Sequence, residues 1–457
     1  MVFTVVLGLG KSGIGAARLL ISQKQSVIVI EERKNLHLEE LSKKLREEGI
    51  EVRLGTALRI SAFEEFFPLK RIIVSPGIPW DHPTLNNLRQ NCFPLMGEMV
   101  LAWEVLGKIP WIAITGTNGK TTVTHLVNHL LSYAGLEAPM CGNIGFSATD
   151  LALSLSKKKI NIPDWLIVEL SSYQIESAPV IRPNIVLWTT LTPDHLERHN
   201  TLFNYRSIKS SLVENSNYQI LNADDLDLSS SAGSWPNANW VSTDLQFALS
   251  KNIKPVLWIA DGYVTNQDGP IFSADGFNLV GVHNQQNLLM AAAVGLKISL
   301  SPKIISEAFR CFPGVPHRLD LIRSYKGIHF YNDSKATNYD AAEVAIKAVE
   351  GPIIVLAGGQ TKKGEANGWI SQLKAKAKAV VLFGQDKEQL KSLLQSSNYI
   401  GGIHCCSSLK EAVPLSLQLA IKHSCCSVLF SPACASFDQY SDFVARGNHF
   451  CQEVETL

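Results

Sequence analysis

Short apolar runs separated by amphipathic stretches set the pattern of this 457-residue chain. The runs do not alternate with polar residues, which is typical of parallel strands that are buried on both faces. Helical patterns lie between them, so the pattern predicts an α/β fold built on parallel sheets. The strands expected on this basis are residues 3–7, 27–30, 52–54, 72–74, 166–170, 185–187, 353–357, 379–383 and 428–430.

The pattern divides the chain into three stretches, each resembling one α/β unit: residues 1–97, 98–314 and 315–457. A chain of this length exceeds what one hydrophobic core supports, which also favours several domains. The Pro-Gly-Val-Pro run at 313–316 is the clearest boundary signal. Within the second stretch we expect a helix near 203–215, whereas the Asp-, Ser- and Asn-rich residues 222–239 predict loops.

Composition excludes several classes of protein. Hydrophobic residues make up 46% and charged residues 18%, and the net charge is +1. These values predict a soluble globular protein without a nucleic-acid-binding surface. Apolar runs are too short for a membrane span, and the N-terminus reads as a first strand instead of a signal peptide. The cysteine number is odd, at nine, without any C-x-x-C, so we expect reduced thiols in a cytoplasm.

The most informative segment is Thr-Gly-Thr-Asn-Gly-Lys-Thr-Thr at 115–122, between an expected strand and an expected helix at 121–134. Glycines let backbone N–H groups close around phosphate oxygens, and the helix N-terminus adds partial positive charge. Lys120 could reach the outer phosphates, and Thr121 could offer its hydroxyl to Mg²⁺. The loop is a shortened G-x-x-G-K-T variant, because Ile114 stands where the usual first glycine would be. It predicts a nucleoside triphosphate site; the alternative is an ordinary strand–helix turn.

A second glycine turn, Gly8–Gly13, fits G-x-G-x-x-G after the first strand, and Glu31 ends the next strand. The glycines would allow close approach of a pyrophosphate, and Glu31 could hold a ribose hydroxyl. Three interpretations stay open from the residues alone: an NAD-type dinucleotide, a UDP group held by the same physics, or a packing turn without a ligand.

Acidic and titratable residues follow two more strands of the second stretch. Glu169 closes one strand and could hold Mg²⁺, although it could instead cap a helix. His195 lies in the polar run 192–199 at the end of another strand, where a structural role is as well supported as a chemical one. Lys209 lies on the expected helix and looks like an exposed surface lysine, because nothing in the composition of that helix distinguishes it.

Three polar loops follow strands in the last stretch: residues 331–338, 357–364 and 431–438. Polar loops at the carboxyl ends of parallel strands suggest a shared ligand rim. Three separate solvated loops are the alternative. Cys434 is expected to be a small buried residue.

Several of these motifs occur together in a known order. The segments 116–122, 142–145 (Gly-Asn-Ile-Gly), 169–174 (Glu-Leu-Ser-Ser-Tyr-Gln), His283-Asn284 with Asn287, Pro316-His317-Arg318 and 332–338 resemble the Mur ligases. The Gly8–Gly13 turn, the run 431–440 and Arg446-Gly447-Asn448 are similar to the branch that adds D-glutamate. The Asp-Asn-Pro-Arg motif of the diamino-acid-adding branch is absent. The resemblance implies an N-terminal Rossmann-like UDP-binding domain, a central P-loop ATPase-like domain and a C-terminal Rossmann-like domain that binds the amino acid.

The resemblance also implies the chemistry. ATP would phosphorylate the alanyl carboxylate of UDP-N-acetylmuramoyl-L-alanine, and the amine of D-glutamate would attack the acyl phosphate in peptidoglycan synthesis. Two Mg²⁺ ions and a carbamate on Lys209 are implied. The partners would be these small molecules alone, with no nucleic acid and no membrane insertion, for a monomeric cytoplasmic enzyme.

Site residues follow by resemblance. The ATP positions are Gly116, Thr117, Asn118, Gly119, Lys120, Thr121, Thr122, Asn287, Arg318 and Asp333, and the metal positions are Thr121, Glu169, His195 and Lys209. Asn143 would lie near the phosphates and the reacting carboxylate, and the UDP positions are Ser12, Glu31 and Ser75. The D-glutamate positions are Lys335, Thr337, Lys362, Ser436 and Phe443. The pair Glu31-Glu32 departs from the family's usual Asp and small polar residue, and we expect Lys11 to offset part of its charge.

Three other classes explain less. A folylpolyglutamate-synthase-like ligase would share the central domain but would not explain the Gly8–Gly13 stretch. A nicotinamide dehydrogenase would leave the phosphate loop idle. A catalytically silent nucleotide-binding regulator would keep Lys120 without needing Glu169, His195 and Lys209.

Overall fold

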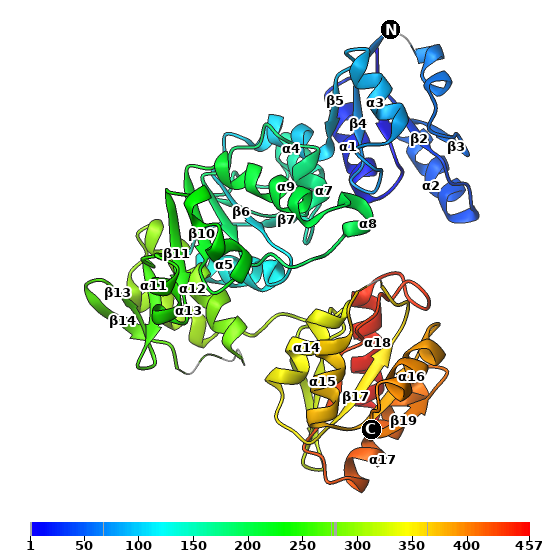
Figure 1. Cartoon of the computed structure of the whole chain (residues 1–457). Coiled ribbons are helices and arrows are strands. Elements are labelled where there is room, and N and C mark those ends of the chain that lie inside the picture. The colour runs from blue at the N-terminus through cyan, green and yellow to red at the C-terminus, as the bar shows by residue number, and fades with distance from the viewer. Residues whose placement is uncertain (1, 67, 276, 278–280, 363) are drawn as a thin grey trace. The chain divides into compact units, whose positions relative to one another are not determined.

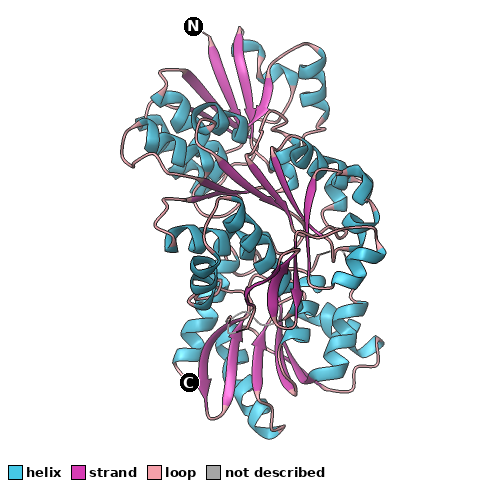
Figure 2. Cartoon of the chain, turned by 90° about the vertical axis from the view of Figure 1, so that its left-hand side faces the viewer, coloured by secondary structure: helices cyan, strands magenta, loops and turns pink. Residues whose placement is uncertain are grey.

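The computed structural model describes residues 2–66, 68–275, 277, 281–362 and 364–457. The chain forms two compact units, one containing the chain up to Phe277 together with Val282–Phe312, and the other containing Pro313–Leu457. Figure 1 traces the chain through its elements, and Figure 2 shows strands flanked by helices throughout. Among the described helices, none is long and apolar enough to cross a membrane.

The first sheet of the first unit is fully parallel, in the order β3-β2-β1-β4-β5. Its turn after β1 depends on glycine: a Cβ on Gly13 would lie 2.0 Å from the carbonyl oxygen of Gly8, whose φ is +92°. This close approach fixes the first helix against the strand end. The elements are β1 (Phe3–Leu7), α1 (Lys11–Ser22), β2 (Ser26–Glu31), α2 (Leu36–Glu47), β3 (Glu51–Leu54), β4 (Leu69–Val74), α3 (Pro83–Gln90) and β5 (Leu95–Gly97).

The second sheet of this unit has the order β14-β13-β12-β11-β10-β9-β6-β8-β7. It is parallel except for β12–β14, which pair antiparallel. Its strands are β6 (Trp111–Thr115), β7 (Met140–Gly142), β8 (Leu166–Glu169), β9 (Ile185–Trp188), β10 (Tyr218–Asn222), β11 (Ala238–Ser242), β12 (Leu257–Ala260), β13 (Tyr263–Asn266) and β14 (Gly269–Ser273). Its helices are α4 (Glu98–Leu106), α5 (Lys120–Tyr133), α6 (Ala148–Ser156), α7 (Ser172–Glu176), α8 (Leu196–His199), α9 (Leu202–Glu214), α10 (Leu226–Ser230), α11 (Leu245–Ser250), α12 (Val282–Lys297) and α13 (Pro302–Arg310).

The second unit is a six-stranded sheet in the order β15-β16-β20-β17-β18-β19, parallel except for β15. Strands β16, β20 and β17 are neighbours, so the three polar loops that follow them leave the same edge of the sheet. The elements are β15 (Asp320–Tyr325), β16 (Ile328–Asn332), α14 (Tyr339–Ala348), β17 (Ile353–Gly358), α15 (Asn367–Lys376), β18 (Ala377–Phe383), α16 (Lys387–Ser396), β19 (Gly402–Cys405), α17 (Leu409–Lys422), β20 (Ser427–Phe430) and α18 (Phe443–Glu455).

These sheets confirm the expected α/β fold, and β1 begins and ends where the apolar pattern placed it. The expectation of loops over residues 222–239 is wrong in part, because α10 and the start of β11 lie there. Asp225 caps α10 by accepting from the backbone N–H groups of Asp227 and Leu228, so the acidic and serine-rich composition marked a helix start as well as turns. The domain boundaries at 97/98 and 314/315 stay predictions.

Candidate active site

The phosphate loop after β6 is closed by its own lysine. Lys120 Nζ donates to the carbonyl oxygens of Gly116 and Thr117, both at 2.8 Å. The loop needs its glycines: Gly119 is left-handed with φ +83°, and a Cβ on Gly116 would lie 1.9 Å from Thr189 Oγ1. The backbone is therefore tightly wrapped at the N-terminus of α5, where amide dipoles favour anions.

The other loop residues are held by the strand-end segment 189–192. Thr117 Oγ1 donates to Thr192 O at 3.1 Å, and the amide of Asn118 donates to Thr190 Oγ1 at 2.9 Å. Asn287, on α12, lies beside the loop, because a Cβ on Gly119 would come within 2.7 Å of its Oδ1. The structure thus brings this member of the expected ATP set to the loop from a distant part of the sequence.

Glu169, at the end of β8, is 1% exposed and faces the start of α5. Its Oε2 accepts from Thr121 Oγ1 at 3.0 Å, and its Oε1 accepts from Asn143 Nδ2 at 2.8 Å. The helix-cap interpretation of Glu169 is wrong, because Ser171 caps α7 with its own side chain. A carboxylate and a hydroxyl side by side are hard oxygen donors of the kind that suits Mg²⁺.

The described residues contain no cluster of three or more His, Cys, Asp or Glu side chains that could hold a metal. This fits Mg²⁺, which is commonly bound through one or two carboxylates together with substrate phosphates instead of a complete protein cage. Thr122 lies next to Thr121 with its hydroxyl buried and without a hydrogen-bond partner in the described part of the chain.

Lys209 is not an exposed helix lysine; that expectation is wrong. It is 1% exposed on α9, and its Nζ donates to Thr115 Oγ1 at 3.1 Å and to Gly116 O at 3.0 Å. Tyr205, Leu212 and Val213 are the other buried positions of α9, so Lys209 lies on the apolar face at helical spacing. The burial of Lys209 follows from the spacing of the apolar residues in α9 and not from the composition of the helix.

Two lysines thus contact one carbonyl oxygen, since both Lys120 and Lys209 donate to Gly116 O. Burial lowers the pKa of Lys209 well below its usual value, and the nearby charge of Lys120 lowers it further. A neutral amine at position 209 relieves the repulsion that two ammonium groups would suffer in a partly dry site.

His195 lies at the neighbouring strand end, with φ of 55°. Its Nδ1 is 3.0 Å from the hydroxyl of Tyr173, and its Nε2 is 3.5 Å from Asp194 Oδ2. Burial lowers the pKa of His199 to about 4, and the charges of Arg198, His195 and Lys209 contribute. His195 and Lys209 therefore both lie near His199.

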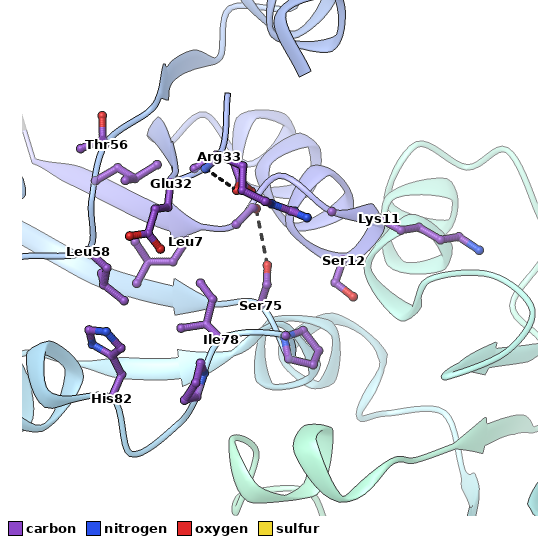
Figure 3. Close-up of a pocket in the computed structure, with 17 residues that line it drawn as sticks. Leu7, Lys11, Ser12, Glu32, Arg33, Thr56, Leu58, Ser75, Ile78 and His82 are labelled. Carbon is purple, nitrogen blue, oxygen red and sulfur yellow. Dashed lines mark hydrogen bonds and ion pairs between the residues drawn. The ribbon is translucent and has the colours of Figure 1, made fainter. Parts of the chain in front are cut away.

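The turn after β1 borders a cavity of about 560 Å³ that Ser12, Glu31 and Ser75 help to line (Figure 3). Glu31 accepts from the backbone N–H of Leu9 at 2.8 Å and from Arg33 Nε at 2.9 Å. Burial opposes ionisation, but the hydrogen bonds from Arg33 and Leu9 outweigh it and lower the pKa of Glu31. The counter-charge is Arg33 and not Lys11, whose Nζ instead donates to Gly145 O at 3.2 Å.

In the second unit, the three polar loops meet around a buried arginine on α18. Arg446 is 0% exposed and donates to Ser334 O at 2.7 Å, Cys434 O at 2.9 Å and Gly358 O at 3.4 Å. Ser431 Oγ also donates to Asp333 Oδ2 at 2.7 Å. The interpretation as three separate solvated loops is therefore wrong: these strand ends form one connected rim.

The expected D-glutamate residues occupy this rim to different degrees. Lys335 Nζ lies 5.0 Å from the centre of the Phe443 ring, so these two are neighbours. Ser436 is 2% exposed. The residue before it, Ala435, forms a β-bridge with Gln360, which lies on the same loop as Lys362. Thr337 is half-buried and Lys362 is exposed. Arg318 lies near Asp333, whose pKa burial raises to about 7 while Ser431 and Arg318 oppose the rise.

Sequence analysis assigned no role to Glu98 or Arg446. Both are charged residue types on apolar helix faces: Glu98 precedes the buried run Met99–Ala102, and Arg446 shares its face with Phe450 and Val454. A charged residue at a core position of an amphipathic helix is the signal that would have identified both, as it would have for Lys209.

Comparison with known proteins agrees with this architecture. Three family models match along the chain: the Mur ligase MurD-like N-terminal domain over residues 3–97, the Mur ligase middle domain over 114–295, and the Mur ligase glutamate ligase domain over 317–434. A protein of Synechococcus sp. called UDP-N-acetylmuramoylalanine--D-glutamate ligase is 52% identical, covering 100% of this chain and 99% of the relative. A protein of the same name from Prochlorococcus marinus is 50% identical, covering 98% of each chain.

Solved structures share the fold at low sequence identity. The UDP-N-acetylmuramate-alanine ligase of Thermotoga maritima has a TM-score of 0.60 at 18% identity and covers 100% of both chains. A folylpolyglutamate synthase of Mycobacterium tuberculosis, complexed with ADP and AMPPCP, has a TM-score of 0.56 at 15% identity over 76% of this chain and 93% of that one. With the family models and the full-length relatives, the conclusion is plain: the chain belongs to the Mur ligase family.

Proposed function

We propose that this protein is an ATP-dependent ligase that adds D-glutamate to UDP-N-acetylmuramoyl-L-alanine through an acyl phosphate in peptidoglycan synthesis. The arrangement of Lys120, Thr121, Glu169 and Lys209 around one phosphate loop carries the proposal. The full-length relatives support the choice of substrates, because their name specifies both UDP-N-acetylmuramoylalanine and D-glutamate. ATP and Mg²⁺ are the cosubstrate and cofactor.

Phosphoryl transfer onto a carboxylate brings several anions together, so charge neutralisation and positioning account for most of the catalysis. We assign Lys120, whose Nζ closes the loop, to the outer phosphates. Asn143 donates to Glu169 and stands beside it, where its amide could also donate to the acceptor carboxylate. We assign Gly116, Thr117, Asn118, Gly119, Thr122, Asn287, Arg318 and Asp333 to ATP.

Two Mg²⁺ ions are proposed, with Thr121 and Glu169 as ligands of one and His195 and Lys209 as ligands of the other. Bound Mg²⁺ supplies positive charge to the phosphates and the reacting carboxylate. For Lys209 to serve as a ligand, its amine must be converted into a carbamate by CO₂. Its burial and its shared acceptor with Lys120 support this, because a second ammonium there would be repelled. The carbamate keeps one N–H, which can still donate to Thr115 or Gly116.

The amine donor is proposed to bind at the rim of the second unit. D-glutamate carries two carboxylates, and Lys335 and Lys362 on two of the three loops supply cations for them. Thr337, Ser436 and Phe443 complete the proposed pocket, with the Phe443 ring beside the Lys335 side chain.

The UDP group is proposed to occupy the cavity in Figure 3. Ser12 and Ser75 offer hydroxyl groups, and the ionised Glu31 still has lone pairs that can accept from a ribose hydroxyl. Residues 1–97 would be the UDP-substrate domain, 98–314 the ATP domain and 315–457 the amino-acid domain.

We further propose a monomeric cytoplasmic enzyme. All nine cysteines are free thiols, which suits a reducing compartment. Each proposed substrate group is assigned to residues of this one chain.

The deciding experiment measures phosphate release from ATP with UDP-N-acetylmuramoyl-L-alanine and a panel of D- and L-amino acids, omitting each component in turn. Release should require all three substrates, because the acceptor carboxylate must be positioned before transfer. Vigorous release with ATP and Mg²⁺ alone would indicate a plain ATPase, and ready use of L-glutamate would contradict the assigned donor.

A further inference from the structure

Glu98 is a buried carboxyl group to which the proposed reaction assigns no role. It is the first residue of α4, directly after the last strand of the first sheet, and it is 2% exposed. Its Oε1 accepts from Gln174 Nε2 at 3.3 Å, whereas its Oε2 is buried without a hydrogen bond of normal geometry in the described chain. Among the described residues, no cation forms an ion pair with it. A buried carboxyl group with so few partners lowers the stability of the fold.

Near neutral pH a substantial fraction of the Glu98 carboxyl group is still protonated. Burial raises its pKa to about 7, and hydrogen bonding with Gln174 and Ser12 opposes the rise only in part. A protonated carboxyl group has an O–H donor as well as acceptor lone pairs. It can therefore accept from Gln174. Ser12 is the second residue of α1, which packs against α4, so its hydroxyl is close enough to accept from the O–H of Glu98.

These two neighbours belong to different sites. Ser12 lines the cavity of Figure 3 at the start of α1. Gln174 holds the turn that follows Glu169, because its Oε1 accepts from both the backbone N–H and the hydroxyl of Ser171 at 3.1 Å. Glu98 thus stands between the cavity and the turn that sets the position of Glu169.

The backbone next to Glu98 is also bonded to the segment that follows Gln174. The N–H of Gly97 donates to Ser177 O at 2.8 Å, and a Cβ on Gly97 would lie 2.2 Å from Ser177 Oγ. A parallel link starts at the residue before Ser12: Lys11 reaches Gly145 O, on the loop that carries Asn143, and Figure 3 shows its side chain extending away from the cavity. The consecutive residues Lys11 and Ser12 are therefore linked to the loop of Asn143 and, through Glu98, to the turn after Glu169.

We propose that Glu98 is a positioning residue that couples the Ser12 turn to the Glu169 turn, so that an acceptor held in the cavity meets the phosphate loop in the correct register. This inference rests on the proposed function, because it concerns how UDP-N-acetylmuramoyl-L-alanine is held. Glu98 itself does not touch the reacting atoms.

The test compares Glu98→Ala, Glu98→Gln and the control Glu104→Gln. Glu104 lies on the same helix but is half-exposed and paired with Arg71. Glu98→Ala should raise the KM for UDP-N-acetylmuramoyl-L-alanine by roughly 10-fold or more, since it leaves Gln174 and Ser12 without a buried partner. The KM for ATP should change by less than about twofold, because the phosphate loop is held by its own lysine and by the segment 189–192.

The conservative variant separates coupling from simple loss of structure. Glu98→Gln keeps the shape of the side chain and the charge of its protonated form, so its KM should stay within about threefold of wild type. Ser12→Ala and the double variant Ser12→Ala/Glu98→Ala should show similar KM values, because the two residues act through one contact. Thermal unfolding accompanies each measurement, and Glu98→Asp replaces Glu98→Ala if that variant does not fold.

Equal rises in both KM values, additive effects of Ser12 and Glu98, or a Glu98→Gln variant as impaired as Glu98→Ala would each overturn the coupling. A wild-type enzyme that does not turn over UDP-N-acetylmuramoyl-L-alanine would instead overturn the proposed function. The wild-type measurement therefore distinguishes a failure of the coupling proposal from a failure of the proposed function.

Discussion

The phosphate loop of the first unit and the three-loop rim of the second unit lie at the carboxyl ends of parallel strands, but they are built differently. The phosphate loop is one continuous segment whose lysine closes on carbonyl groups three and four residues before it. The rim takes its parts from β16, β17 and β20, and Arg446, from a fourth segment, joins them. The first site is local in sequence, and the second exists only after the sheet has formed.

Their charges differ in the same way. Lys120 and Lys209 crowd one carbonyl oxygen, so the first site depends on which charge state each lysine holds. Arg446 spreads its donors over carbonyl groups of all three loops, so the second site depends on the geometry of one guanidinium group. The phosphate site should therefore respond to changes of charge, and the rim to changes of shape at constant charge.

The largest expected effect is at Lys209. Lys209→Ala should lower kcat by roughly 10²-fold or more, the scale for deleting one preorganised electrostatic element. Lys209→Arg should be no better, because a guanidinium stays cationic and cannot become a carbamate. Steady-state phosphate release measures both variants, and ¹³C NMR of the wild type after exposure to labelled bicarbonate reports the carbamate directly.

Acetate sharpens this prediction. A small carboxylate can fill the space left in Lys209→Ala and supply the missing oxygens, so activity should recover in part with acetate and not with chloride. Near-normal turnover of Lys209→Arg, or the absence of a carbamate signal in active enzyme, would contradict the assignment.

The next effect is structural and belongs to the rim. Arg446→Lys keeps the charge but loses the planar fork, and we expect it to destabilise the protein by about 3 kcal/mol, because buried carbonyl groups lose their donors. Arg446→Met should cost at least as much. Urea unfolding measures both, with Lys374→Met as an exposed control. Wild-type stability for Arg446→Lys would show that charge alone holds the loops.

These two sites also show how far the sequence could lead. The phosphate loop was predictable because Gly116, Gly119 and Lys120 are adjacent and their spacing is itself the geometry. The sequence predicted that these three strand ends form a rim, but it did not predict which residue joins them. Arg446 follows the last of the three loops and donates to carbonyl groups of all three. Burial of Lys209 was accessible from helical periodicity but not from composition. Contacts between distant segments, such as Asn287 with Gly119, needed the fold.

A third, smaller effect tests the exposed side of the rim. Lys362→Ala should raise the KM for D-glutamate by roughly 10- to 50-fold, the scale for a hydrogen bond to a charged group, while the KM for ATP stays unchanged. Lys362 is exposed, so stability should not change. Initial rates at varied D-glutamate and varied ATP separate the two constants, with exposed Lys378→Ala as the control. Parallel loss of ATP affinity would move Lys362 to the nucleotide.

The last expected effect is a pH slope, spread over several pH units, that compares one buried acid from each unit. Burial raises the pKa of both Asp333 and Glu98 to about 7. The folded chain therefore holds two protons that the unfolded chain releases at lower pH, so stability should fall as pH rises from about 5 to 7 and level off above that. Each group contributes at most about 1.4 kcal/mol per pH unit, the limit for one proton.

Asp333→Asn and Glu98→Gln should each remove part of this slope, and the double variant should remove both parts, because the two acids lie in separate units. Urea unfolding of the unliganded protein at pH 5, 6, 7 and 8 measures the slopes. A slope unchanged in Asp333→Asn would mean that its carboxyl group is already ionised in the folded rim, with Ser431 and Arg318 outweighing burial. The rim would then be set by charge after all, as the phosphate loop is, and the contrast between the two regions would fail at its centre.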